Sequence, residues 1–365
     1  MRTFIVILFV LLSRLTAAQK SDTLTKYLDK NLAFTNKSGM IYPAIAFPQN
    51  GHWVLRSVYP DNSIIVEAYF LDKKLTVNDG LFDVNYPGGI PAIRGTYHNN
   101  YRSGVWQSWF KNGQLKDSGS LINDVLTGTW LTYYDNGTLM TRAHFNEQVG
   151  STGLSPLVSG NKNTLLSFPP SVAIKTGLYE SWHLNGLRQD SGNYQNDLKT
   201  GFWKLWYENG KPESEGSYDA SENMQGNWIF YREDGSISTK EKYADNKLSD
   251  LTCFDEKGNL TGSFCSIAKP PVLLGTPYDW KDFFETHLVW SKETIKKSGE
   301  GVITIRFTIG KDGKLVNHTL LNSPSTMVTE DIEKVIRLMT DWSPAILHNR
   351  PLEYSFDYQV PFYPN

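Results

Sequence analysis

The chain has 365 residues, of which 40% are hydrophobic and 13% aromatic, so it has enough apolar material for the cores of two or three domains. Its 36 lysines and arginines nearly balance its 38 aspartates and glutamates, which gives a formal net charge of −2. No basic block or stripe interrupts this balance, which argues against a nucleic-acid partner.

The N-terminus has the features of a secretory signal peptide over residues 1–18. Arg2 precedes an apolar run over residues 4–12, and small residues follow up to Ala18, so we expect cleavage between Ala18 and Gln19. The apolar run is too short to span a bilayer, and no later segment approaches the length of a transmembrane helix. The alternative is a leader that stays uncleaved and anchors the chain.

One short phrase recurs about every 24 residues between residues 80 and 265, after an N-terminal region, residues 19–79, that shows only a degenerate hairpin. The phrase is a glycine, any residue, an aromatic residue, two residues, two aromatic residues and a second glycine that follows a turn. Its copies begin at Gly80 in weaker form, Gly104, Gly128, Gly177, Gly201 and Gly226, and a trailing copy ends at Gly258. Alternating aromatic and polar residues predict half-buried strands, and the Asn-Gly turns predict hairpins.

A single hairpin cannot bury its aromatic face alone, so neighbouring hairpins must stack. The sequence therefore predicts an all-β hairpin repeat array, an antiparallel meander. Gly128 and Gly177 lie about two periods apart. We interpret this gap as an insertion over about residues 146–176 that contains a decayed repeat between Gly153 and Asn163.

The phrase resembles the variant MORN repeat, in which Gly-x-Trp-x-x-Tyr-Tyr-x-x-Gly hairpins run in series, over about residues 80–262. The resemblance implies a scaffold that contacts proteins or lipids. It implies no shared reaction, because repeats of this kind have no common chemistry.

Two sets of aromatic residues should lie on opposite faces of the repeat strands. The tryptophans in the third position of the phrase are expected to form the shared core: Trp106, Trp130, Trp203 and Trp228. Trp109, Trp182 and Trp206 lie three residues later and should face the other side, where they would form an exposed aromatic patch if that face is solvated. Such a patch would make a glycan-binding or wall-binding protein an alternative.

Cys253 and Cys265 are the two cysteines of the chain. In an oxidising compartment a disulfide between them would stabilise the fold by about 2–3 kcal/mol. The turn at Lys257-Gly258 places Cys265 beyond direct cross-strand reach of Cys253, so two buried thiols are the open alternative.

Residues 266–277 are predicted to be a linker, because the consecutive prolines Pro270 and Pro271 exclude helix and central strand. A small α+β domain should follow over residues 278–365. Its expected elements are a helix capped by Asp279, a strand over Val302–Ile309, a returning strand over Lys314–Leu321, a helix capped by Thr329, and a last strand that begins at Leu352 and reaches Val360.

The order of these elements resembles the TonB C-terminal domain. The residues that carry the resemblance are Gly301–Ile309, Asp312–Val316, Trp342–Ala345, Arg350–Leu352 and Val360–Phe362. The resemblance implies an antiparallel sheet packed on two helices, and a bacterial envelope protein that is secreted across the inner membrane and stays in the periplasm or at the outer membrane. It also implies binding of an envelope protein, or of a short peptide from an outer-membrane transporter, beside the last strand by strand addition.

The polar side of that strand is Glu353, Ser355, Asp357 and Gln359, which we expect to set partner specificity. A homodimer through the same edge is also compatible with the resemblance. An energy transducer of this class needs a membrane anchor and a long spacer, and this chain has a cleavable leader and a short linker. The anchored transducer is therefore an alternative, and the protein should be peripheral to the membrane at most.

A search for reactive groups returns no catalytic, metal-binding or cofactor-binding pattern. The seven histidines are scattered, and none forms a metal-binding pair with another histidine or a cysteine. His183 replaces the second aromatic residue of its phrase, which predicts a packed ring. We therefore expect a non-enzymatic protein without cofactor or metal.

Processing of the N-terminus can be tested directly. Because the apolar run is short and ends in small residues, the mature protein should begin at Gln19. Intact-mass spectrometry of the protein from its native envelope checks this. A membrane-bound form that retains Met1 would contradict the prediction and would favour the anchored transducer.

Overall fold

The computed structural model describes residues 22–146, 173–262, 267–277, 279–297, 301–322 and 325–362. The chain divides into two compact units, Met1–Gln225 and Gly226–Asn365. The cleavage site at Ala18 and Gln19, the segment between Gly153 and Asn163, and Cys265 lie outside the described residues.

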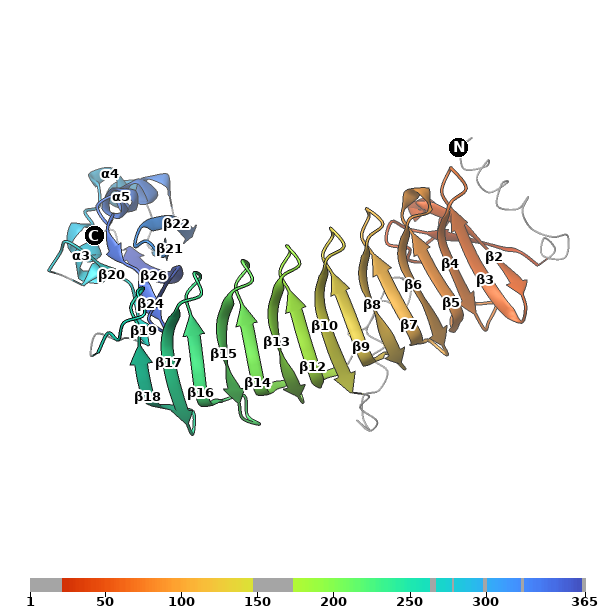
Figure 1. Ribbon diagram of the computed structural model, residues 1–365. Coiled ribbons are helices and arrows are strands. Elements are labelled where there is room, and N and C mark those ends of the chain that lie inside the picture. The colour runs from red at the N-terminus through yellow and green to blue at the C-terminus, as the bar shows by residue number, and fades with distance from the viewer. Residues whose placement is uncertain are drawn as a thin grey trace. The chain divides into compact units, whose positions relative to one another are not determined.

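Eighteen strands, β1 to β18, form one antiparallel meander sheet (Figure 1). The strands of the first unit are β1 (Leu24–Leu28), β2 (Tyr42–Gln49), β3 (His52–Val58), β4 (Ile64–Phe70), β5 (Asn78–Asn85), β6 (Pro91–His98), β7 (Tyr101–Trp109), β8 (Leu115–Ile122), β9 (Val125–Tyr133), β10 (Leu139–Asn146), β11 (Ile174–Lys175), β12 (Gly177–Trp182), β13 (Arg188–Gln195), β14 (Leu198–Trp206) and β15 (Pro212–Tyr218). They are followed by β16 (Met224–Tyr231), β17 (Ile237–Ala244) and β18 (Lys247–Cys253). Short 3-10 helices lie at Lys37–Gly39 and Pro87–Gly89. The predicted hairpin meander is confirmed.

The N-terminal region contains more sheet than the one degenerate hairpin that its sequence predicts. Strands β1 to β4 pair in chain order and continue into β5. Their buried side chains, such as Leu28, Leu55 and Phe70, form one cluster with Trp106 of the repeats. Most of β2 is buried on both faces, so it lacks the alternation of polar and apolar residues by which a half-buried strand is recognised.

The insertion leaves the register of the repeats unbroken. Strand β10 pairs directly with β12, with Thr141 opposite Ser181 and Arg142 opposite Glu180. The hairpin β9–β10 therefore has β12–β13 as its neighbour in the sheet. A decayed repeat stacked between them, as the spacing of Gly128 and Gly177 suggests, is wrong.

In three copies of the phrase, the tryptophan in the third position lies flat on a glycine of the preceding strand. A Cβ atom added to Gly95, Gly119 or Gly192 would collide with the indole of Trp106, Trp130 or Trp203, respectively. The indole N–H then donates to a backbone carbonyl of that strand, from Trp106 Nε1 to Thr96 O and from Trp203 Nε1 to Asn193 O, both at 3.1 Å. Trp106, Trp203 and Trp228 are at most 5% exposed. The predicted core position is confirmed for these three, and we call this side of the sheet the core face.

Hydrogen bonds between turns tie several neighbouring hairpins of the first unit together at both ends of the strands. At one end the seventh residue of the phrase reaches a carbonyl of the following hairpin, from Tyr86 Oη to Trp109 O at 3.2 Å and from Tyr134 Oη to Trp182 O at 2.9 Å. At the other end two-residue turns with positive φ, such as Asn123-Asp124, accept a backbone N–H of the preceding hairpin. The array is therefore held together by backbone groups as well as by its core.

The second unit adds a small α+β module to the last strands of the array. Its elements are β19 (Ala268–Lys269), β20 (Val272–Leu273), α3 (Trp280–His287), α4 (Lys292–Lys297), β21 (Gly301–Ile309), β22 (Leu315–Asn322), α5 (Thr326–Ile336), β23 (Trp342–Ser343), β24 (Ala345–Leu347), β25 (Arg350–Leu352) and β26 (Tyr354–Phe362). The main sheet has the order β22-β21-β26. Side chains of β21 and β26 pack with α3 and α5 around Phe284, Phe307 and Ile332, which are fully buried. The small α+β region is confirmed.

Two details of this module differ from the elements predicted from the sequence. Helix α5 begins after Ser325, whose hydroxyl accepts from Val328 N, and Thr329 lies inside the helix. The predicted linker contains β19 and β20, which pair with β24 and β23 on either side of Pro270 and Pro271. The two prolines exclude a continuous strand, but they leave room for these two short ones.

The core position can be separated from the opposite face by mutation. Trp203 is fully buried, so Trp203→Ala should destabilise the protein by about 3–5 kcal/mol, as truncation of large buried aromatics does. Trp206→Ala, at the end of the same strand β14, is the matched control and should cost clearly less. Urea unfolding of both variants checks this. Equal losses would mean that the two faces of β14 are equally buried.

Candidate functional site

Trp109, Trp182 and Trp206 lie at equivalent positions of β7, β12 and β14, on the face opposite the core face. They are half-buried, and cationic side chains cover part of each ring. The cations lie 5.6–5.9 Å from the ring centroids: Arg94 over Trp109, Arg142 and Arg188 over Trp182, and Arg188 and Lys204 over Trp206. The predicted aromatic row therefore exists as an alternation of cations and indoles rather than as a bare aromatic patch.

Glu180 holds this row together. Its carboxylate is buried and accepts from Arg142 Nη1 and Arg188 Nη2, each at 2.8 Å. Both guanidinium groups are thereby fixed beside Trp182. The sequence signal for this arrangement is weak, because the three residues lie on three different strands and come together only through the direct pairing of β10 with β12.

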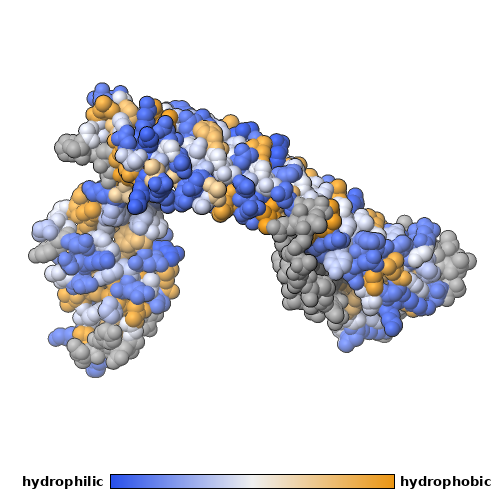
Figure 2. Space-filling model, turned by 90° about the horizontal axis from the view of Figure 1, so that it is seen from below, coloured by the Kyte–Doolittle hydropathy of each residue, from blue (hydrophilic) through white to orange (hydrophobic). Residues whose placement is uncertain are grey.

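The same face carries a row of exposed apolar side chains in the second position of the phrase. Leu81, Val105, Leu178 and Phe202 are 39–59% exposed. In the view of Figure 2, hydrophobic residues occur as separate patches between hydrophilic ones. Larger contiguous apolar patches with a polar rim mark contact surfaces, whereas apolar side chains scattered singly are normal on protein surfaces.

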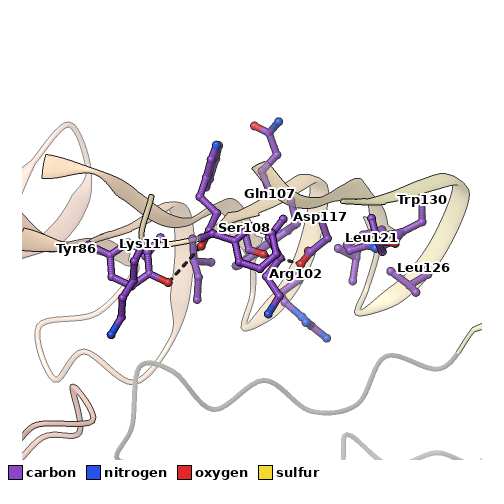
Figure 3. Close-up of a pocket in the computed structure, with 16 residues that line it drawn as sticks. Tyr86, Arg102, Gln107, Ser108, Lys111, Asp117, Leu121, Leu126 and Trp130 are labelled. Atoms are coloured by element: carbon purple, nitrogen blue, oxygen red, sulfur yellow. Dashed lines mark hydrogen bonds between the residues drawn. The ribbon is translucent and has the colours of Figure 1, made fainter. Parts of the chain in front are cut away.

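A groove of about 640 Å³ lies on the core face over β6 to β9 (Figure 3). Aromatic and aliphatic residues line most of it, among them Tyr86, Trp106, Leu126 and Trp130. Arg102, Lys111, Lys116 and Asp117 add charge at its border. Figure 3 shows Gln107 pointing away from the side on which Tyr86, Lys111 and Arg102 lie. The sequence does not predict this groove, because the groove forms between hairpins and leaves no local pattern.

Two hydrogen bonds fix the charged groups of the groove. Ser108 Oγ donates to Asp117 Oδ2 at 2.5 Å, and Arg102 Nε donates to Asp124 Oδ1 at 2.6 Å. Lys111 and Lys116 are exposed, and no ion pair of either lysine occurs among the described residues. These two lysines therefore supply the positive charge that the groove can offer to a ligand.

The predicted partner-binding residues lie in and beside β26. Asp357 accepts two hydrogen bonds from Arg306 of β21, at 2.7 and 2.8 Å, and Thr308 Oγ1 and Ser355 Oγ lie 2.8 Å apart. The hydrogen bonds from Arg306 lower the pKa of Asp357. Gln359 lies opposite Thr304. The structure thus brings Ser355, Asp357 and Gln359 together, and ties two of them to the neighbouring strand.

Two predictions about this strand need correction. Leu352 belongs to β25, where it pairs with Ala345, so it does not belong to the last strand. Glu353 lies between β25 and β26 and is not part of the edge. The predicted packing of the apolar row on the helices holds for Phe356 and Tyr358, whose ring centroids each lie 5.0 Å from that of Trp280 in α3. It does not hold for Tyr354, which is 42% exposed.

Pro361 shows which backbone groups of β26 face outward. It pairs with Val302 of β21 and has no N–H, so we infer that this is a pair without hydrogen bonds between the two strands. Such pairs alternate along an antiparallel ladder. Ser355, Asp357 and Gln359 have the same parity as Pro361, and their N–H groups therefore point away from β21, toward the side where no strand pairs with β26 in the described residues.

The turn between β24 and β25 contacts the last hairpin of the array inside the second unit. His348 and Asn349 have positive φ, and the His348 ring stacks on Phe230 with centroids 3.5 Å apart and planes inclined by 7°. Asn349 Nδ2 donates to Phe254 O at 3.1 Å, and Arg350 Nη1 donates to Tyr231 O at 2.9 Å. We call these residues, His348 to Arg350, the docking turn.

Glu241 is the charged partner of the docking turn. Its buried carboxylate accepts from Thr239 Oγ1 and Tyr243 Oη, at 2.8 and 2.6 Å, and lies 2.8 Å from His348 Nδ1. Burial alone would raise the pKa of Glu241, but the hydrogen bonds from His348 and Tyr243 and the charge of His348 lower it. The carboxylate is therefore held ionised and tied to the docking turn.

The described residues contain no cluster of metal-ligand side chains and no helix of a membrane-spanning kind. No group of three His, Cys, Asp or Glu side chains within them is placed to hold a metal ion. Among their helices, none has the length and apolar character needed to cross a membrane. The Nε2 atom of His183 lies 2.8 Å from Trp206 O, which agrees with the predicted packed ring. Cys253 is buried at the end of β18, and its bridge to Cys265 stays a prediction.

Comparison with known families supports the repeat architecture. The MORN repeat variant family matches residues 126–147 and 199–220. These segments cover β9 with β10 and β14 with β15, so each match is one hairpin of the array. No curated protein was found to match the chain. The resemblance of residues 278–365 to the TonB C-terminal domain stays a prediction.

The lowered pKa of Glu241 predicts a pH dependence. A carboxyl with a lowered pKa in the folded state stabilises the fold above its ordinary pKa of 4.5 and loses this contribution as the pH falls through the lowered value. Glu241→Gln should therefore reduce stability at pH 7 by about 1–3 kcal/mol, and the difference from wild type should shrink below the ordinary pKa of glutamate.

Thermal melting of both proteins from pH 7 to pH 3 measures this difference. Other carboxyls titrate in the same range, so the comparison between the two proteins is the readout. A difference that stays constant down to pH 3 would contradict the role given to the ionised carboxylate.

Proposed function

We propose that the protein is a non-enzymatic scaffold of the bacterial envelope whose C-terminal module binds an extended segment of a protein partner by strand addition. The observation that carries this proposal is the outer side of β26, with which no strand of the described residues pairs and toward which three N–H groups point. Two of its polar side chains are already tied to β21. Main-chain pairing along an exposed strand supplies affinity without requiring a pocket.

The structure of the array is compatible with a scaffold. Its hairpins stack in one direction, and its surface offers two separate faces with different chemistry, a cation-aromatic row and a groove. The match to the MORN repeat variant supports a scaffold role, which in such repeats often concerns contacts with proteins or membranes. The residues between β5 and β18 then display binding surfaces and carry out no reaction.

Location in the envelope rests on the N-terminal sequence and on the resemblance to the TonB C-terminal domain. Both support secretion across the inner membrane to the periplasm or the outer membrane. The partner is then an envelope protein or a peptide of an outer-membrane transporter. An anchored energy transducer would require that residues 1–18 are retained, and intact mass separates the two.

The side chains around β26 limit what sets specificity. Asp357 is engaged by Arg306 and Ser355 by Thr308, so neither has its full capacity for a partner. Gln359 and the exposed ring of Tyr354 remain accessible beside the edge. Specificity for the partner therefore comes mainly from Gln359 and Tyr354, and Ser355 and Asp357 contribute less.

Glycan binding on the opposite face is the second candidate. Trp182 of β12 and Trp206 of β14 lie two strands apart, which is roughly 9–10 Å. Trp109 of β7 lies four strands from Trp182, and Tyr133 of β9 occupies the equivalent position between them. A regular row of rings at this pitch suits a polymer of flat sugar rings. Titration of tryptophan fluorescence with soluble glycan fragments tests this candidate, and an unchanged signal in wild type and in Trp182→Ala would remove it.

Replacement of one outward donor tests the strand-addition proposal. Ser355→Pro should leave the module folded, because the N–H of Ser355 points away from β21, and should block pairing with a partner strand. Ser355→Ala keeps the donor and is the matched control. The full mature chain serves as bait in an envelope extract, and thermal melting confirms the fold of both variants.

Wild type and Ser355→Ala should retain the same partner, and Ser355→Pro should lose it. If a folded Ser355→Pro protein retains that partner, β26 is not the docking edge. If Ser355→Pro unfolds the module, the donor already pairs within the protein, and the assignment of outward groups is wrong.

A further inference from the structure

The contact between the docking turn and the last hairpin shows what kind of structure the core face can receive. The turn is a two-residue hairpin tip that places a flat ring on Phe230 and a charged contact on Glu241. Its backbone and side chains meet three further groups, Ser238 Oγ, Tyr231 O and Phe254 O. The receiving surface therefore combines an aromatic floor, acidic charge and backbone carbonyls.

The groove over β7 to β9 lies at the equivalent position of an earlier hairpin. The register of the strands defines the correspondence, because Trp109 pairs with Leu115 and Tyr231 pairs with Ile237. By this register the following residues correspond: Ser108 to Phe230, Lys111 to Glu233, Lys116 to Ser238, and Asp117 to Thr239. All four of the first-named residues line the groove.

The two sites differ in which of the described residues cover them. In the last hairpin the docking turn stacks on Phe230, and Lys311 of the module also pairs with Glu233. At the earlier hairpin Ser108 takes the place of Phe230, so the floor is lower and the space of about 640 Å³ remains. The walls of that space are mainly aromatic and aliphatic.

The charge is reversed between the two sites. The filled site presents Glu233 and Glu241 and receives the basic side chains of Lys311, Arg350 and His348. The open site has Lys111 where Glu233 stands and Lys116 where Ser238 stands. The open site also contains Asp117, whose carboxylate accepts a hydrogen bond from Ser108. The guanidinium of Arg102 donates to Asp124.

We propose that the groove over β7 to β9 receives the tip of an acidic turn from a protein partner, with an apolar or planar side chain in the groove and a carboxylate between Lys111 and Lys116. The proposal rests on the proposed function of the array as a protein-binding scaffold, and it names the chemistry of one binding surface. Burial of the apolar side chain against Trp106 and Trp130 supplies affinity, and the two lysines supply selectivity.

A pair of hairpin peptides provides the probe. The basic peptide has the sequence of residues 345–352, which contains the docking turn, and is closed by a disulfide between added terminal cysteines. The acidic peptide is the same molecule with His348→Glu and Arg350→Glu. Fluorescence anisotropy of each labelled peptide is measured against the full mature chain.

The acidic peptide should bind the full chain at least about tenfold more tightly than the basic peptide, because Lys111 and Lys116 attract its carboxylates and repel the cations of the basic peptide. The double variant Lys111→Glu with Lys116→Glu should lose at least a factor of about ten in affinity for the acidic peptide and gain affinity for the basic one. The matched control, Lys247→Glu with Lys257→Glu, changes two exposed lysines outside the groove by the same charge and should bind as wild type does.

The exchange of preference distinguishes a binding site from a loss of structure, because an unfolded variant cannot gain affinity for the basic peptide. Three results would each overturn the proposal. They are equal binding of the two peptides to wild type, no binding of the acidic peptide, and a control variant whose affinity changes as much as that of the groove variant. Such a result leaves the docking edge of β26 untouched, since Ser355→Pro tests that edge separately.

Discussion

One contact sets the geometry of the array: an indole that lies flat on a glycine of the preceding strand. The Trp203 ring covers Gly192 so closely that a Cβ atom there would collide with it, and the indole N–H closes the contact on the carbonyl of Asn193. The aromatic residue and the glycine come from neighbouring hairpins, so neither is useful without the other. A chain that keeps this pair at a constant period must stack its hairpins in register, and the insertion after β10 does not disturb that register.

Because one face and two residue types carry the stacking, the other positions of the phrase are free to vary. The same strand position holds Ser108 in one hairpin and Phe230 in another, and the fold is unchanged. The first gives a groove and the second gives a floor for the docking turn. The second, fourth and sixth positions of the phrase, which face the other side, vary in the same way and produce the row of cations and indoles around Glu180. Binding surfaces in such an array are local changes on a constant frame.

The sequence predicts this frame well, because the frame depends on local patterns. The period of the phrase, the hairpin turns and the core tryptophans such as Trp203 could all be recognised from spacing. The N-terminal strand β2 could not, since it is buried on both faces and shows no alternation. The groove and the contact between His348 and Glu241 also left no signal, because they join residues that are far apart in the chain. The edge of β26 was predicted from its apolar row, but its start was misplaced because Leu352 continues the alternation into a separate short strand.

The docking turn explains how a repeat array can end. A stack of hairpins leaves an incomplete face at its last member, and repeat proteins close such faces with a polar cap. Within the array, carbonyls such as Trp182 O accept from the seventh residue of the preceding phrase. At the last hairpin, Tyr231 O accepts from Arg350 and Phe254 O from Asn349. The module thus presents to the array a turn of the same positive-φ type that the array uses between its own hairpins. The docking turn does not involve β26, and no strand of the described residues pairs with the outer side of β26. The module can therefore close the last hairpin and still offer this edge for strand addition.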